Sequence, residues 1–586
     1  MVNSNHKNDY LISSVYRAFL VISILTMLST MTGILVDNIV AGVLLGEKAL
    51  GAMSIVGPMA FLCSFLNNIC ATGGMSKAAQ AMGKGNKQEF DNCFTIVIIF
   101  IFSTGISLTF AGLIFSSQVA YFLGGRDELQ VLADEYLQGY LWCLLPNVLV
   151  SAVNSFARID GSINLPLQSI LVMTVSDILL DFLFVGYMEG GMFGLGFATT
   201  VSYVLALCVS CSHFFKKTNS YRLIKPVNFF STLMSIMATG FPTAMVRLGE
   251  TAKWVFLNVL LATFIASGAG AVAALNIRMQ VNNVVSAVII GMGQTTVPIA
   301  SLFYGEEDRT SLQETLNYSL RIGLFINVVV GVVMCIFPRT LVSLFGVEEA
   351  HIVEMSVFAI VTLGISFPLR GINTTFASFY QATRQRMLAT IISVLQSFVF
   401  VCLIAYLLIF PLGDEGVWWA FVFAEVATFL FVVGYIWWKK GKVPRSLSDF
   451  MLFGKNFGVT EDERFEISVE NNIDDVVKAS KSAYDYAIAK GVDEKRANAV
   501  SLLIEEVGCN IVKFAFDDEK KHWLDIVLIY KDNRVVLLFR DNGKAFDPIA
   551  YANKNEVGLG LKIVRGIAKR FEYGNILGLN ELWLEC

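Results

Sequence analysis

The chain has 586 residues, of which 55% are hydrophobic and only 16% are charged, whereas soluble proteins average about 25% charged residues. This composition excludes a single soluble globule, and the net charge of −4 excludes a nucleic-acid binder recruited by bulk positive charge. Charged residues make up about 11% of positions 1–440 but about 31% of positions 441–586. The sequence therefore predicts a large membrane domain followed by one soluble domain, with no nucleic-acid partner.

A short polar leader, residues 1–15, precedes twelve apolar runs that are each long enough to cross a bilayer, which takes about 20 helical residues. An all-α polytopic membrane domain is therefore expected. The runs lie at about 16–44, 50–76, 92–118, 134–157, 164–187, 192–214, 233–263, 270–300, 317–337, 353–380, 387–411 and 416–438.

The connections between these runs alternate in charge. Lys84, Arg158 and Lys439 represent the basic connections, and Glu128 and Glu415 represent the acidic ones. Because Lys and Arg resist translocation, the basic side is expected to be cytoplasmic. We therefore predict a multi-pass protein of the inner membrane, embedded in the lipid bilayer, with both termini in the cytoplasm.

An internal repeat divides the membrane domain into two halves. Three features return 222 residues later: Ala49–Met53 as Ala271–Leu275, Gly83 as Gly305, and Pro146 as Pro368. Two six-helix halves are expected, at 16–220 and 221–440. Because six is even, the halves have the same orientation and are related by an axis along the membrane normal, an arrangement typical of carriers with a central cavity.

Three aspartates lie inside the predicted membrane helices: Asp37 in the first, and Asp177 and Asp181 in the fifth. A charge at mid-bilayer costs at least about 2.5 kcal/mol, so each is a functional candidate. A carboxylate in a partly dry cavity can exchange a proton, a cation and a positively charged substrate. Asp177 and Asp181 are four residues apart and share a helix face. The alternative is that one of them pairs with a nearby cation or caps a helix end.

Glu250 is a fourth candidate, in the seventh predicted helix. It lies three residues from both Arg247 and Lys253, so mutual neutralisation is the alternative to a transport role.

The tail begins with a linker, 441–460, and continues as an α/β domain, 461–586. Periodicity predicts a strand at 465–469, helices at about 474–490 and 494–516, a hairpin from 523–530 and 534–540, a helix at about 560–571 and a final strand near 581–584.

Three groups of tail residues suit nucleotide chemistry. Glu506 and Asn510 share a helix face, where an acid can orient a water or hydroxyl and an amide can hold Mg²⁺. Asp541 and Gly543 end a strand in a tight turn, which suits an acceptor for an adenine amino group. Gly558 and Gly560 open a helix, whose free N–H groups can approach phosphates. Their order within about 55 residues makes the set specific.

Several segments of the membrane domain form an ordered set: Val36–Gly42 with Gly46–Leu50, Gly73–Gly74 with Ala79–Asn86, Arg158–Gly161, Asp181–Phe184 and Gly194–Thr199. With this set the membrane domain resembles the multidrug and toxic compound extrusion (MATE) transporters. The resemblance implies that Asp37 is the cation-coupling aspartate and that Glu250 matches a sodium-binding glutamate of one branch. Arg370 stands where that branch has an acid and would disfavour a second cation site.

The tail resembles the GHKL ATP-binding domains, which are α/β two-layer sandwiches of the Bergerat type, and among them the anti-sigma-factor serine kinases, with Asp547–Pro548 and Gly578–Asn580. The resemblance implies that Glu506 is the catalytic base, Asn510 the Mg²⁺ ligand and Asp541 the adenine contact, with glycines Gly543, Gly558 and Gly560 in the nucleotide loops. Phe514 replaces the family's usual His, and Ala545 replaces a glycine. These departures count against kinase activity more than against ATP binding.

We therefore predict an exporter of cationic or amphipathic organic compounds that works by alternating access and is driven by H⁺ or Na⁺. The tail is expected to bind Mg-ATP and either to regulate the carrier or to phosphorylate a Ser or Thr of an antagonist-type cytosolic protein. It lacks the GxxxxGK[ST] loop of transport motors. One alternative is a sensor-regulator whose tail is the output. Another is a flippase for lipid-linked precursors.

Overall fold

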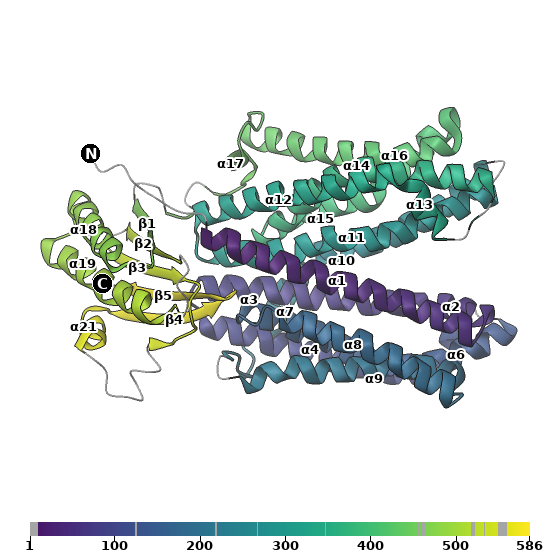
Figure 1. Ribbon diagram of the computed structural model, residues 1–586, viewed down its shortest axis with the longest axis horizontal. Helices are drawn as coiled ribbons and strands as arrows, with labels where there is room; N and C mark the ends of the chain where they lie inside the picture. The colour runs from purple at the N-terminus through teal and green to yellow at the C-terminus, as the bar shows by residue number, and fades with distance from the viewer. Residues whose placement is uncertain are drawn as a thin grey trace.

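The helices of the membrane domain form one bundle, and the C-terminal domain lies against one end of it (Figure 1). We call this end of the bundle the docked end. The computed structural model describes residues 10–585 apart from 124–125, 217–218, 266–267, 346, 348, 455–456, 460–462, 517–521, 532–533 and 549–558.

Eleven helical runs among the described residues are long and apolar enough to cross a membrane. The last of them, Arg386–Lys440, is interrupted at Gly413, whose φ of 61° and ψ of −138° are not helical. This run therefore contains the last two predicted spans, and the predicted twelve-helix membrane domain is confirmed.

The elements of the two halves follow the internal repeat. The N-terminal half contains α1 (Tyr10–Leu44), α2 (Glu47–Asn67), α3 (Gly73–Gly83), α4 (Lys87–Ile114), α5 (Ser116–Phe122), α6 (Asp127–Tyr140), α7 (Leu144–Ile159), α8 (Leu165–Asp181) and α9 (Gly191–Cys211). The C-terminal half contains α10 (Phe229–Phe264), α11 (Gly268–Gly305), α12 (Arg309–Ile336), α13 (Pro338–Ser343), α14 (Ala350–Ala382), α15 (Arg386–Val394) and α16 (Phe400–Lys440), and α17 (Leu447–Phe450) follows.

Within the described ranges, three membrane helices contain π-helical turns, which often mark functional sites. They are η1 (Asn68–Thr72), η3 (Phe182–Tyr187) and η5 (Leu395–Val399). Of these, η3 begins directly after Asp181, one of the predicted transport residues. One of these helical irregularities therefore adjoins a residue that the sequence analysis selected for chemistry.

The two halves meet closely at the docked end, through glycines that the repeat relates. A Cβ atom on Gly83 would lie 2.2 Å from the carbonyl oxygen of Leu302, and one on Gly305 would lie 2.3 Å from that of Gln80. Nearby, the hydroxyl oxygens of Ser76 and Ser301 are 2.7 Å apart. The crossing of α3 and α11 therefore holds the bundle closed at this end.

Gly305→Ala should disfavour this closed arrangement, because the added methyl group would meet backbone, which cannot rotate away. We expect a cost of about 1–3 kcal/mol, as for overpacked cores. Labelling of a cysteine introduced at the docked end should become faster. Gly434→Ala is the control, since a Cβ there has nothing within 4 Å. Equal labelling of the two variants would contradict the prediction.

The C-terminal domain has two layers, one of helices and one antiparallel sheet. The helices are α18 (Ile473–Ala489), α19 (Glu494–Phe514) and α21 (Leu559–Ile567). The strands are β1 (Arg464–Glu470), β2 (Trp523–Lys531), β3 (Arg534–Asp541), β4 (Arg570–Ile576) and β5 (Leu579–Glu585), in the order β1-β2-β3-β5-β4.

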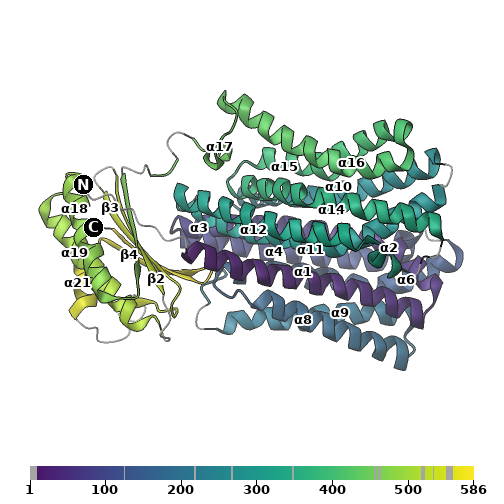
Figure 2. The same ribbon diagram turned by 45° about the horizontal axis from the view of Figure 1, so that its top comes forward.

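The predicted α/β sandwich is confirmed, with one element misassigned. The helix expected to reach Phe571 ends at Ile567, and residues Arg570–Ile576 form β4 instead. Apolar side chains on one face of the sheet, among them the paired residues Ile526 and Phe539, pack against the helices. The opposite face of the sheet turns toward the docked end of the bundle (Figure 2).

Candidate functional site

The three aspartates predicted for transport come together in the N-terminal half. The carboxyl group of Asp37 on α1 lies against that of Asp177 on α8, and Asp181 is close to Asp177 on the same helix. The side chains of Thr199 and Ser202 on α9 lie beside Asp177. Among the described residues, no Lys, Arg or His lies within 4 Å of the three carboxyl groups. This acidic cluster can therefore accept a proton or a cation.

Glu250 lies apart from the acidic cluster, on the wall of a cavity of about 170 Å³ in the C-terminal half. Its Oε1 is 2.9 Å from Nη2 of Arg370, and its Oε2 is 4.0 Å from Nη1 of Arg247. Arg370, which the sequence analysis placed near this site, is thus the nearest cationic partner of Glu250. The charge of the Glu250 carboxylate is balanced by the neighbouring arginines.

In the tail, Asp541 ends β3 on the face of the sheet that carries the helices. Its Oδ1 accepts hydrogen bonds from the Gly543 N–H and from Nδ2 of Asn580, both at 2.8 Å. Asn580 stands directly opposite Asp541 in the register of β3 and β5. Burial raises the pKa of Asp541, and the two hydrogen bonds oppose that shift. No hydrogen bond to Oδ2 is formed within the described ranges, so this oxygen is available to an adenine amino group.

The turn after Asp541 is held against the end of α19. Lys544 donates its N–H to the carbonyl of Ala515 at 2.7 Å, and a Cβ on Gly543 would lie 2.5 Å from the same oxygen. Gly543 is therefore required by close packing. Glu506 and Asn510 lie on α19, where Asn510 is exposed.

Gly560 lies in the first turn of α21, as predicted for a phosphate-binding helix, while Gly558 lies outside the described residues. The residues present fit Mg-ATP: Asp541 offers an acceptor for the adenine amino group, Asn510 an amide for Mg²⁺, and the start of α21 free N–H groups for the phosphates.

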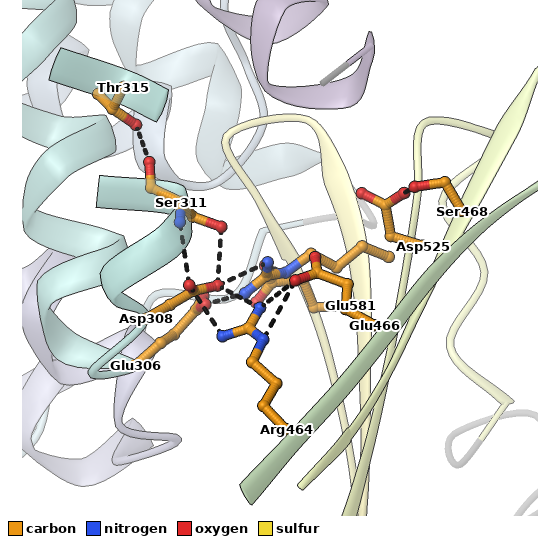
Figure 3. Close-up of polar contacts among 10 residues, drawn as sticks. Glu306, Asp308, Ser311, Thr315, Arg464, Glu466, Ser468, Asp525 and Glu581 are labelled. Atoms are coloured by element: carbon orange, nitrogen blue, oxygen red, sulfur yellow. Dashed lines mark hydrogen bonds and ion pairs between the residues drawn. The ribbon is translucent and has the colours of Figure 1, made fainter. Parts of the chain in front are cut away.

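Directly beside Asp541 in the strand, Arg540 points to the opposite face of the sheet and forms buried ion pairs at the docked end. Figure 3 shows its partners Glu306, Asp308 and Glu581. Its Nε is 3.0 Å from Glu581 on β5, its Nη1 is 3.3 Å from Asp308, and its Nη2 also pairs with Glu306. Glu306 and Asp308 lie in the connection between α11 and α12. Strand β3 therefore carries the predicted adenine-contact residue Asp541 and a membrane-domain contact at adjacent positions.

Asp308 joins this network to a second strand and to the start of a membrane helix. Its carboxylate oxygens are 2.9 Å from the guanidinium of Arg464 on β1. It also caps α12 by accepting from the Ser311 N–H at 3.0 Å and from the Ser311 hydroxyl at 2.7 Å. The sheet thus contacts the side chain that caps the start of α12.

The turn between β4 and β5 contacts the N-terminal half of the bundle. Leu577 donates its N–H to the carbonyl of Ile159 at 2.8 Å. A Cβ on Gly161 would lie 2.3 Å from Oδ1 of Asn575, and one on Gly578 would lie 3.1 Å from Ile163. The C-terminal domain therefore touches connections of both halves at the docked end.

Raising the pH should weaken this docking. Burial, together with the neighbouring Glu581 and Asp308, raises the pKa of Glu306 well above its usual value, and Arg540 only partly opposes this. The docked state therefore holds a proton that an undocked Glu306 releases above about pH 4.5. The contribution of Glu306 to docking is therefore complete below that pH and is lost as the pH rises through its raised pKa.

The distance between one dye on α18 and another on the bundle reports this equilibrium. Glu306→Gln should flatten its pH dependence, and the exposed substitution Glu494→Gln should leave it unchanged. A pH profile of the Glu306→Gln variant identical to that of the wild type would contradict the assignment.

Comparison with known families identifies the membrane domain. The MatE family model matches residues 23–183 and 242–407, which together exceed half of the chain. The chain belongs to the MatE family. A second model, the histidine kinase-like ATPase domain, matches residues 469–585. Both predicted resemblances are therefore confirmed: this MatE chain is a multi-pass membrane protein with a C-terminal ATPase-like domain.

Relatives of this MatE chain include proteins named as drug exporters. The multidrug export protein MepA of Staphylococcus saprophyticus is 24% identical over 422 residues, which cover 70% of this chain and 91% of MepA. The probable multidrug resistance protein YoeA of Bacillus subtilis is 25% identical over 458 residues, which cover 74% of this chain and 96% of YoeA.

Solved structures share the fold of the MatE chain. One is an outward-facing multidrug resistance MATE family transporter of the MOP superfamily, with a TM-score of 0.68 and a sequence identity of 21%. The match covers 75% of this chain and 96% of that transporter. A MOP superfamily transporter from Pyrococcus furiosus has a TM-score of 0.67 at 21% identity, with the same coverage.

The sequence analysis did not select Glu306, Asp308, Arg464 or Arg540 of this MatE chain. A signal was present: alternate residues of the predicted strands carry charges of both signs on one face, as Arg464 and Glu466 do in β1. That pattern was compatible with an ordinary solvent-facing side of the sheet. Asn580 was noted only as part of a motif, whereas in the structure it positions Asp541.

Proposed function

We propose that the protein exports organic compounds by alternating access, driven by inward movement of H⁺ or Na⁺ at the acidic cluster of Asp37, Asp177 and Asp181. The observation that carries this proposal is the convergence of three membrane carboxyl groups from α1 and α8 with no cationic partner among the described residues. The names of the MepA and YoeA relatives support multidrug efflux. Amphipathic compounds with a cationic group match the charge of this cluster.

The docked end is assigned to the cytoplasm in this proposal. The basic connections that contain Lys84 and Arg158 contact the C-terminal domain through their neighbours Gly85 and Ile159. The domain then meets cytosolic ATP, and the closed crossing of α3 and α11 lies on the cytoplasmic side. Such an arrangement corresponds to a carrier that is closed toward the cytoplasm.

Purified protein in proteoliposomes tests the export proposal. Ethidium should move against its gradient when an H⁺ or Na⁺ gradient is imposed, and only one of the two ions should suffice. If no substrate moves under either gradient while a ligand changes nucleotide binding by the tail, the protein is a sensor-regulator. If a lipid-linked precursor crosses the membrane and ethidium does not, it is a flippase.

For the tail we propose Mg-ATP binding and regulation of the carrier. The support is the adjacency of Asp541 and Arg540, which connects the nucleotide face of β3 to Glu306 and Asp308 of the membrane domain. The second candidate, a kinase that phosphorylates Ser or Thr of an antagonist-type protein with Glu506 as base, rests on the family resemblance. The buried sheet face favours regulation.

Asn510→Ala should lower Mg-dependent ATP affinity of the full-length protein by at least about tenfold, because it removes the side chain assigned to the metal. Titration calorimetry with Mg-ATP, repeated with the Mg²⁺ chelated, measures the effect. Asn498→Ala is the matched control, since Asn498 is an exposed asparagine on the same helix. Unchanged affinity in Asn510→Ala would remove Asn510 from the site.

A further inference from the structure

The cavity in the C-terminal half has a predominantly basic lining. Four cationic side chains and two carboxylates face it, so the formal charge of the lining is +2. The cavity measures about 170 Å³, whereas a single water needs about 10–15 Å³ of the same kind of volume, so it can hold a ligand group and several waters. The charged residues of the lining are Arg247, Lys253, Arg278, Arg370, Glu250 and Glu425.

The two carboxylates of the cavity already have partners. Glu250 pairs with Arg370, at 2.9 Å, and more distantly with Arg247. Glu425 accepts hydrogen bonds from Nδ2 of Asn373 at 2.8 Å and from Nε2 of Gln396 at 3.1 Å. Neither carboxylate lies within 4 Å of the other two cations.

Those two cations, Lys253 and Arg278, are buried beside one aromatic ring. They are only 5% and 1% exposed. Nζ of Lys253 is 5.7 Å from the ring centre of Phe421, and Cζ of Arg278 is 4.0 Å from the same centre. Within the described parts of the chain, neither has a carboxylate within 4 Å. Glu250 and Glu425 act on Lys253 only from beyond 4 Å, so the cost of holding two like charges close together in a membrane interior is only partly offset.

Arg278 also has an unused donor. Its Nη1 donates to the Thr362 hydroxyl at 3.0 Å and to the carbonyl of Ala359. Its Nη2 is buried and has no hydrogen-bond partner among the described residues. A guanidinium fixed on one side and free on the other presents a directed N–H group to a ligand oxygen.

We propose that this cavity binds the oxyanion group, a carboxylate or a phosphate, of an amphipathic organic substrate at Lys253 and Arg278. The Arg278 Nη2 and the Lys253 ammonium donate to the anion, and the apolar body of the ligand packs against Trp254 and Phe421, which line the same cavity. The anion supplies a counter-charge in direct contact with both cations, which no carboxylate among the described residues provides. The inference deepens the proposed export function, on which it rests, by adding an anionic substrate group to its substrate class.

Binding to purified full-length protein tests the proposal without an ion gradient. Carboxyfluorescein is the soluble anionic probe, and its binding is followed by fluorescence polarisation. Lys253→Gln and Arg278→Gln should each weaken binding by about 10–100-fold, the range for losing a charged hydrogen-bond donor. Arg321→Gln, an exposed arginine on α12, should bind like the wild type. Ethidium affinity should not fall in the two cavity variants.

A second arm identifies the source of the anion. The wild type is placed in nanodiscs of phosphatidylglycerol or of phosphatidylcholine, and carboxyfluorescein binding is compared. Weaker carboxyfluorescein binding in phosphatidylglycerol than in phosphatidylcholine indicates that the headgroup of an anionic lipid occupies the site, whereas equal binding indicates a soluble anion. Thermal unfolding verifies that each variant is folded, and Arg278→Lys, which keeps the charge, should retain part of the affinity.

The proposal is overturned if the wild type binds neither anionic probe, or if folded Lys253→Gln binds carboxyfluorescein as the wild type does. A wild type that shows ion-driven ethidium efflux but no anion binding rejects this inference alone. A wild type that binds the anion but shows no efflux rejects the export proposal alone.

Discussion

Asp37→Asn should reduce ion-driven export from proteoliposomes to the background of protein-free vesicles. Asparagine keeps the shape of the side chain, but it neither takes up a proton at physiological pH nor offers a negative charge to Na⁺. Asp37 faces Asp177 across α1 and α8, so the substitution leaves the remaining carboxyl groups without the partner that completes the cluster. Ethidium efflux under imposed H⁺ and Na⁺ gradients is the measurement.

Two variants make this result specific to the cluster. Glu354→Gln removes an exposed carboxyl group on α14 and should export at the wild-type rate. Asn510→Ala should keep ion-driven export, because the tail is not the motor in the proposed mechanism. Export that survives in Asp37→Asn would move the coupling site elsewhere in the membrane domain.

Arg540→Ala should release the C-terminal domain from the bundle. The side chain is 3% exposed and pairs with Glu306, Asp308 and Glu581, so its removal leaves buried carboxylates without their main counter-charge. Breaking a buried ion pair from one side costs about 3–5 kcal/mol, which shifts the docking equilibrium by at least about 100-fold. Hydrogen exchange of β3 and β5 should accelerate, and ATP should no longer change the export rate.

Matched substitutions separate undocking from unfolding. Arg534→Ala removes an exposed arginine from the start of the same strand and should leave exchange unchanged. Combining Arg540→Met with Glu306→Gln and Glu581→Gln removes charge from both sides, and docking should be partly restored. Normal exchange and ATP response in Arg540→Ala would show that the ion network does not hold the domain.

Much of the membrane fold could be predicted from the sequence, because each span must be apolar over its own length and needs no distant partner. Even the break at Gly413 follows from local sequence, since Pro411 and Gly413 both disfavour a continuous helix. The missed strand β4 shows the limit of local reasoning. Phe571 and Tyr573 alternate with polar residues, but the helical pattern before them continues to Phe571 and conceals the change of period.

The positions of the site residues relative to one another depend on tertiary packing, which the periodicity of the sequence does not indicate. Asp37 and Asp177 are 140 residues apart in the sequence, and only the packing of α1 against α8 brings them together. The tail motifs were accessible because Asp541 and Gly543 are neighbours in the chain. The pairing of Arg540 with Glu306 joins two domains, and no local pattern indicates which charge of a strand will be buried by another domain.

The neighbouring positions of Arg540 and Asp541 on β3 have a mechanical consequence. Successive side chains of a strand share a peptide unit and point to opposite faces, and the two are separated by no loop or hinge. A displacement of the strand end by a bound adenine would therefore reach the connection between α11 and α12 without passing through the linker at Gly441. Communication between the domains would then not depend on a signal carried along that linker.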